Sequence, residues 1–133
     1  MKRCLAAILT GVFAVTLTGS SALAGDEPVP PVQRMVPLPE VLSPDKFDRP
    51  LLKRAYAAAA RNREIVSQLP CYCWCSRFGH RSLLDCFVSS HGANCDICIK
   101  EVLLAEEMVR KGKPLADIRS AIIRQEYRAV PLR

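Results

Sequence analysis

The chain has 133 residues with 19 basic and 13 acidic side chains, which give a formal net charge of +6. The basic residues are scattered among acidic ones and form no stripe interleaved with aromatic side chains, which excludes the usual pattern of a nucleic-acid-binding protein. The sequence shows no Ser/His/Asp set, carboxylate pair or glycine-rich phosphate loop, so hydrolase and kinase activities have no residues to carry them. We therefore expect a protein that is not an enzyme.

Residues 1–24 have the three-part layout of a secretory signal peptide. Two basic residues are followed by an apolar stretch at residues 5–17 and by Ala22-Leu23-Ala24, after which the sequence turns polar. The apolar run is shorter than the roughly 20 residues that a membrane span needs. We expect cleavage after Ala24, so that the mature chain is periplasmic or secreted and has no transmembrane span.

The next segment, residues 25–49, is rich in proline. It holds most of the ten prolines of the chain, and proline at this density blocks both helix formation and strand pairing. We expect a semi-rigid extended linker, and an ordered arm packed along the domain is the alternative. Residues 50–133 then form one small domain, which buries too little surface to be stable on apolar burial alone and is expected to need cross-links or a metal.

Apolar residues at helical spacing predict helices, and no strand pattern is convincing. The predicted helices cover residues 50–69, 95–111 and 114–127. Pro70 must end the first of them, and Asn94 is a candidate cap for the second. A capping-box pattern that begins at Ser82 adds a further short helix. The predicted fold is all-α, a small Cys-rich domain of about four helices.

The main functional signal is a cluster of thiols. Six cysteines and both histidines fall between Pro70 and Cys98, and the seventh cysteine, Cys4, lies in the leader. Three of the cysteines alternate with other residues over positions 71–75, and in an extended stretch their side chains would point to one side. The candidate metal ligands are Cys71, Cys73, Cys75, His80, Cys86, Cys95 and Cys98.

A ligand set made almost entirely of thiolates favours a soft metal ion. Cu(I) is the first choice for an exported protein, since more than four thiols suit a polynuclear site, and a structural Zn(II) held by four cysteines is the alternative. Cys95 and Cys98 are expected in the first turn of a helix, whose dipole favours thiolates. His80 lies in the Cys-rich loop, whereas we expect His91 to be a solvated turn residue. The expected function is binding, storage or transfer of the ion in the cell envelope.

Two other interpretations of the same cysteines stay open. Six cysteines in a small exported domain also suit three disulfides, each linking one cysteine of residues 71–75 to Cys86, Cys95 or Cys98. Such a domain would act in protein interaction, with a partner in the envelope bound through the proline-rich arm. Less favoured is a redox protein, because the spacing of Cys95 and Cys98 is that of a dithiol catalyst but the βαβ pattern of a thioredoxin is missing.

The order of these motifs resembles a family of bacterial exported proteins named for a PCYCGC motif. The resemblance covers about two thirds of the chain and implies a fold and a set of candidate ligands, not an activity. Trp74 stands where the motif has glycine, so either the turn forms without a positive φ or the family's local geometry is lost. Members are often lipoproteins, but this leader lacks a lipobox, and we do not expect membrane anchoring. The resemblance rests on residues 70–75, Gly79-His80, Ser82-Leu83, Cys86-Phe87, Cys95 and Cys98.

Overall fold

The computed structural model describes residues 28–133, and the predicted signal peptide lies outside this range. The α-helices are α1 (Pro50–Arg61), α2 (Arg63–Val66), α3 (Asp96–Arg110) and α4 (Leu115–Ile123). The 3-10 helices are η1 (Pro44–Lys46), η2 (Cys75–Phe78), η3 (Leu83–Phe87), η4 (Ser90–Asn94) and η5 (Glu126–Ala129). Residues 28–133 contain no strand, which confirms the all-α prediction. No helix in this range is long and apolar enough to span a membrane.

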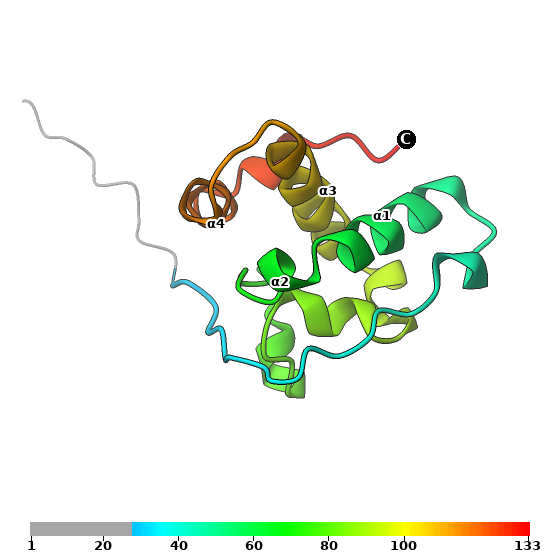
Figure 1. Cartoon of the computed structure of the whole chain (residues 1–133), viewed down its shortest axis with the longest axis horizontal. Coiled ribbons are helices and arrows are strands. Elements are labelled where there is room, and N and C mark those ends of the chain that lie inside the picture. The colour runs from blue at the N-terminus through cyan, green and yellow to red at the C-terminus, as the bar shows by residue number, and fades with distance from the viewer. Residues whose placement is uncertain (1–27) are drawn as a thin grey trace, which may run out of the picture.

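Helix α3 is the central element of the fold. It packs against α1 and also against α4, η5, η4 and η3 (Figure 1). Ala55 and Ala58 of α1 are fully buried, and side chains this small let two helices approach closely. Cys98, Val102 and Ala105 of α3 are also fully buried, so the apolar face predicted for this helix is the one that meets the core. The first turn of α3 therefore places Cys98 in the interior of the domain.

The helix predicted over residues 50–69 is interrupted at Asn62. Its backbone leaves the helical region (φ −117°, ψ 30°), and its side-chain amide donates to the carbonyl of Ala58 at 2.8 Å. The same amide contacts the Glu106 carboxylate of α3. Asparagine competes in this way for backbone hydrogen bonds, and the single turn α2 follows in a new direction. The chain then reaches Pro70 pointing towards α3.

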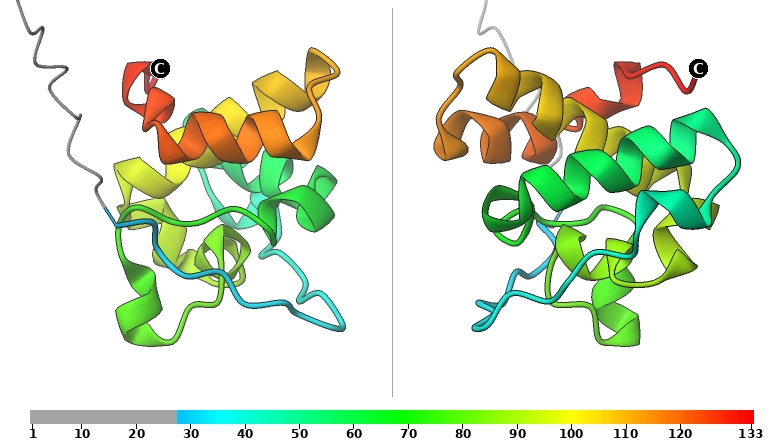
Figure 2. Two further views of the ribbon diagram at one scale, coloured as in Figure 1. Left: turned by 90° about the vertical axis from the view of Figure 1, so that its left-hand side faces the viewer. Right: turned by 45° about the vertical axis from the view of Figure 1, so that its right-hand side comes forward.

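The proline-rich segment packs along the domain from Pro28 onward. Pro30 and Met35 are buried, the amide of Gln33 donates to the carbonyl of Arg81 at 2.8 Å, and that of Leu42 donates to the carbonyl of Phe87 at 2.9 Å. Figure 2 shows this arm crossing the same part of the molecule as the Cys-rich segment. The described part of the segment has the form of an ordered arm, held by backbone hydrogen bonds to Arg81, just before η3, and to Phe87, the last residue of η3.

Candidate metal centre

Residues 70–75 form a tight turn instead of an extended stretch. The amide of Trp74 donates to the carbonyl of Cys71 at 3.1 Å, and η2 begins at Cys75. The predicted strand-like alternation of side chains is therefore wrong. The three motif sulfurs meet because the chain curls around them: Cys73 Sγ lies 3.1 Å from Cys71 Sγ and 2.8 Å from Cys75 Sγ.

Trp74 makes this turn with a left-handed backbone. Its φ is 59° and its ψ 31°, a conformation that costs an L-residue roughly 1–2 kcal/mol and costs glycine almost nothing. The sequence pattern predicted either a turn without positive φ or the loss of the family's geometry, and the positive φ of Trp74 rules out the first of these. Trp74 adopts a conformation suited to the motif glycine, and its indole is covered by the guanidinium of Arg77, 5.6 Å from the ring centroid.

Two later segments complete the group of sulfurs. Cys98 Sγ of α3 lies 3.5 Å from Cys71 Sγ and 3.3 Å from Cys73 Sγ. Cys86 Sγ of η3 lies 3.7 Å from Cys71 Sγ. Five sulfurs thus fall within 4.8 Å of one another, and all but that of Cys73 belong to buried residues. We call these five the thiol cluster: Cys71, Cys73, Cys75, Cys86 and Cys98.

The size of the thiol cluster suits metal binding. A tetrahedral ion with metal–sulfur bonds of about 2.3 Å holds its sulfurs about 3.8 Å apart. Among the contacts given above the sulfurs lie 2.8 to 3.7 Å apart, and all pairs of the cluster lie within 4.8 Å. All six cysteines of the described chain are free thiols. The donors are thus gathered from three segments into a space that an ion with its ligands would fill, and the cluster can hold a thiophilic metal.

Cys95 is beside the thiol cluster but outside it. It interacts with Cys73 and Cys98 without joining the five mutually close sulfurs. It is the N-cap residue of α3, which begins one residue later than predicted. The predicted cap, Asn94, instead donates its side-chain amide to the carbonyl of Ser90 at 3.3 Å.

Both histidines contact the sulfurs. His80 Nδ1 lies 3.3 Å from Cys86 Sγ, and His91 Nε2 lies 3.0 Å from Cys75 Sγ. His91 is exposed, as expected of a solvated residue, but it also lies against Cys75, which the sequence analysis did not expect. Its place is set by Gly92, where an added Cβ would lie 2.7 Å from the carbonyl oxygen of Cys86, so that only glycine lets η4 approach η3 this closely. No local pattern in the sequence predicts the contact between η4 and η3.

Glu101 is a further residue that the sequence analysis missed. It is fully buried one helical turn after Cys98, and its Oε1 accepts a hydrogen bond from the amide of Tyr72 at 2.8 Å. Burial, followed by the charge of Cys71, raises the pKa of Glu101 well above its usual value, which favours the neutral carboxylic acid. The sequence did offer a signal for a buried glutamate, because Glu101 follows Cys98 by three residues on the apolar face of a predicted helix.

The charge within the thiol cluster is uneven. Hydrogen bonds from neighbouring thiols, that of Cys73 first, hold the pKa of Cys71 far below its usual value. The contact with Cys71 is also the largest of the influences that raise the pKa of Cys98. The pKa of Cys73 is also lowered, to about 3, whereas those of Cys75 and Cys86 are raised. This pattern favours thiolates at Cys71 and Cys73 beside thiols, so an incoming cation meets ready ligands and displaces protons from the others.

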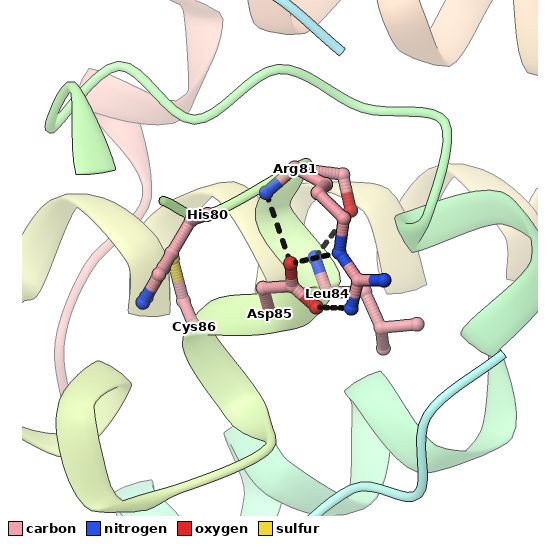
Figure 3. Close-up of polar contacts among 6 residues, drawn as sticks. His80, Arg81, Leu84, Asp85 and Cys86 are labelled. Atoms are coloured by element: carbon pink, nitrogen blue, oxygen red, sulfur yellow. Dashed lines mark hydrogen bonds and ion pairs between the residues drawn. The ribbon is translucent and has the colours of Figure 1, made fainter. Parts of the chain in front are cut away.

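A salt bridge supports the loop between the motif and η3. The Asp85 carboxylate accepts from the Arg81 backbone amide at 2.9 Å and from the Arg81 guanidinium at 2.8 and 2.9 Å (Figure 3). Asp85 therefore does not form the predicted capping box with Ser82, although Ser82 Oγ does accept from the amide of Leu84. Since His80 and Cys86 flank this pair in the chain, the bridge fixes the segment that presents both donors.

The fold and the site together define a class: small, all-helical proteins with a buried cluster of free thiols. Comparison with known proteins gives the family. The model of a family described as a protein of unknown function with PCYCGC motif matches residues 35–130, and the chain belongs to this family. Searches of curated proteins and of solved structures give no match to the chain.

Proposed function

We propose that the protein binds Cu(I) in the cell envelope after export and stores, buffers or passes on the ion without catalysing a reaction. The observation that carries the proposal is the thiol cluster, five sulfurs within 4.8 Å of one another. Soft thiolate donors select soft ions such as Cu(I) over oxygen-seeking ions such as Ca²⁺ or Mg²⁺.

The number of sulfurs favours Cu(I) over a structural Zn(II). A zinc site is satisfied by four ligands in tetrahedral arrangement, whereas the cluster has five sulfurs and Cys95 lies beside it. Cys73 contacts three other sulfurs at 2.8 to 3.3 Å, which is the arrangement that bridging thiolates of a polynuclear site require. Zinc held by four of these cysteines is the competing outcome of the test.

The surroundings of the cluster support retention of a bound ion. Cys86 and Cys98 are fully buried. The neutral form of Glu101 is favoured, so its carboxyl group adds no further strong anion beside the thiolates of the cluster. The arm also reaches the cluster, because Pro30 and Pro31 border the same small recess as Cys71 and His80. Exclusion of water on several sides slows both oxidation of the thiols and loss of the ion.

The decisive experiment expresses the full chain and purifies the exported protein, without the leader that holds Cys4, from the periplasm of an expression host without reductant and without oxygen. Intact mass, metal content and thiol titration are measured on the same sample. We expect six titratable thiols and bound copper after growth with added copper. Loss of six hydrogens with no metal would instead establish the disulfide-linked domain, and one zinc per chain that copper fails to displace would establish the structural zinc site.

A single substitution tests the placement of the site. Cys73→Ser removes a sulfur that contacts three others of the cluster and should lower the copper content sharply. Ser76→Ala, three residues later in η2, is the matched control and should leave copper content unchanged. Equal copper content in the two variants would show that the motif turn is not the centre of the site.

A further inference from the structure

A second set of donors lies at the edge of the thiol cluster. One ligand atom from each of Cys75, His80 and His91 lies within 4.8 Å of the other two. The two imidazole rings stand edge to face, with their centroids 4.7 Å apart. His80 lies in the loop between η2 and η3, and His91 lies in η4. With Cys75 they form a donor set of two nitrogens and one sulfur, in contrast to the all-sulfur thiol cluster.

The two sets share one sulfur and differ in their surroundings. Cys75 belongs to both groups, because its Sγ lies 2.8 Å from Cys73 Sγ on one side and 3.0 Å from His91 Nε2 on the other. Two cysteines of the cluster, Cys86 and Cys98, are fully buried, whereas Cys75 keeps 2 % of its surface exposed. The histidines lie on the side of Cys75 nearer to solvent, and each keeps part of its surface exposed.

We propose that Cys75, His80 and His91 form a second copper site, distinct from the thiol cluster and joined to it through the bridging sulfur of Cys75. This inference rests on the proposed function. One thiolate and two imidazoles are ligands that copper accepts, and three donors leave one side of the ion open to solvent. The outer site is then the position at which copper enters or leaves, and the shared sulfur connects it with the buried cluster.

Other features of the molecule support this division into two sites. Gly92 seats η4 against the carbonyl of Cys86, and Tyr56 holds η4 from the other side by donating to the Ser89 carbonyl at 2.8 Å and accepting from the amide of Ala93 at 3.1 Å. His91 is thus anchored by contacts on both sides of it in the chain. The Arg81–Asp85 bridge holds the chain just after His80, and the amide of His80 itself donates to the carbonyl of Cys75 at 3.2 Å.

The test loads the full chain with Cu(I) under anaerobic conditions, removes weakly held copper with a competing chelator, and counts the copper that stays bound. X-ray absorption of the same samples reports imidazole and sulfur ligands separately. We expect the double variant His80→Gln/His91→Gln to retain one copper ion fewer than the unmodified protein and to lose the imidazole signal while keeping the sulfur signal. Ser90→Ala, beside His91 on η4, is the matched control and should keep both.

A reciprocal variant separates two sites from one mixed site. Cys98→Ser removes a sulfur of the cluster that is not part of the outer set and should lower the sulfur signal while the imidazole signal persists. Loss of the imidazole signal in Cys98→Ser, or an unchanged copper count in the double histidine variant, would overturn the second site and leave the thiol cluster standing. Absence of copper from the unmodified protein would overturn the proposed function itself. Circular dichroism of each metal-free variant confirms that it is folded.

Discussion

The left-handed backbone of Trp74 leads to a prediction that compares two substitutions at one position. Trp74→Gly and Trp74→Ala both remove the indole and its contact with Arg77, so the loss of these contacts cancels in the comparison. They differ in the cost of φ 59°, roughly 1–2 kcal/mol for alanine and near zero for glycine. The greater flexibility of glycine in the unfolded chain offsets about 0.5–1 kcal/mol of the stability that glycine gains over alanine at this φ. We expect Trp74→Gly to be the more stable by about 1 kcal/mol.

The assay is urea or thermal unfolding of the metal-free protein with reductant present. A difference of 1 kcal/mol corresponds to a shift of about 4–8 °C in the midpoint for a domain of this size. Phe78 provides the control, because it is exposed, lies in η2 and has no positive φ. There alanine should be as stable as glycine or more so. If Trp74→Ala equals or exceeds Trp74→Gly in stability, the turn does not need a left-handed residue and our account of the motif is wrong.

Three further predictions concern the supports of the site. Gly92→Ala places a methyl group against the carbonyl of Cys86. It should lower the free energy of unfolding by about 1–3 kcal/mol, measured by urea unfolding, and weaken copper binding by His91, measured by copper counting. Unchanged stability and copper count would contradict the close approach of η4 to η3. Asp85 has a lowered pKa because the hydrogen bonds from Arg81 outweigh the effect of burial. Its stabilising contribution is therefore present above the unfolded pKa of about 3.9 and is lost as the pH falls through the lower folded value. The unfolding midpoints at pH 6 and pH 3 should differ less in Asp85→Asn than in the unmodified protein. Equal differences in the two proteins would count against the bridge. Cys98→Ser should reduce copper retention against a chelator more than Cys95→Ser does, because only Cys98 belongs to the cluster, and the reverse order would place the ion nearer the start of α3.

The secondary structure could be predicted from local patterns, because apolar periodicity and proline act within one segment. The break at Asn62 could not, since it depends on a side-chain contact with Glu106 of α3 that only the packed fold creates. Likewise the sulfurs were correctly expected to converge, but for the wrong reason. The extended geometry was assumed from the alternating spacing, whereas a turn closed between Cys71 and Trp74 brings them together.

The ligand set shows the same division between local and tertiary information. His80 was found because it lies near the motif in the chain, and Cys86 and Cys98 because of their residue type. His91 and Glu101 were missed, since the approach of η4 to η3 and the depth of the α3 face are properties of the assembled domain. Cys95 was expected in the first turn of α3, but the helix begins one residue later and Cys95 is its N-cap residue.

The thiol cluster takes three of its five sulfurs from a single five-residue turn and the other two from segments that lie far along the chain. The turn can therefore chelate an ion while the rest of the protein is unfolded, because closing so short a loop costs little entropy. Folding then brings Cys86 and Cys98 to an ion already in place. Under the proposed function, copper bound during export would favour the native chain, and its affinity would rise as the domain assembles, so that metal binding and folding are thermodynamically coupled.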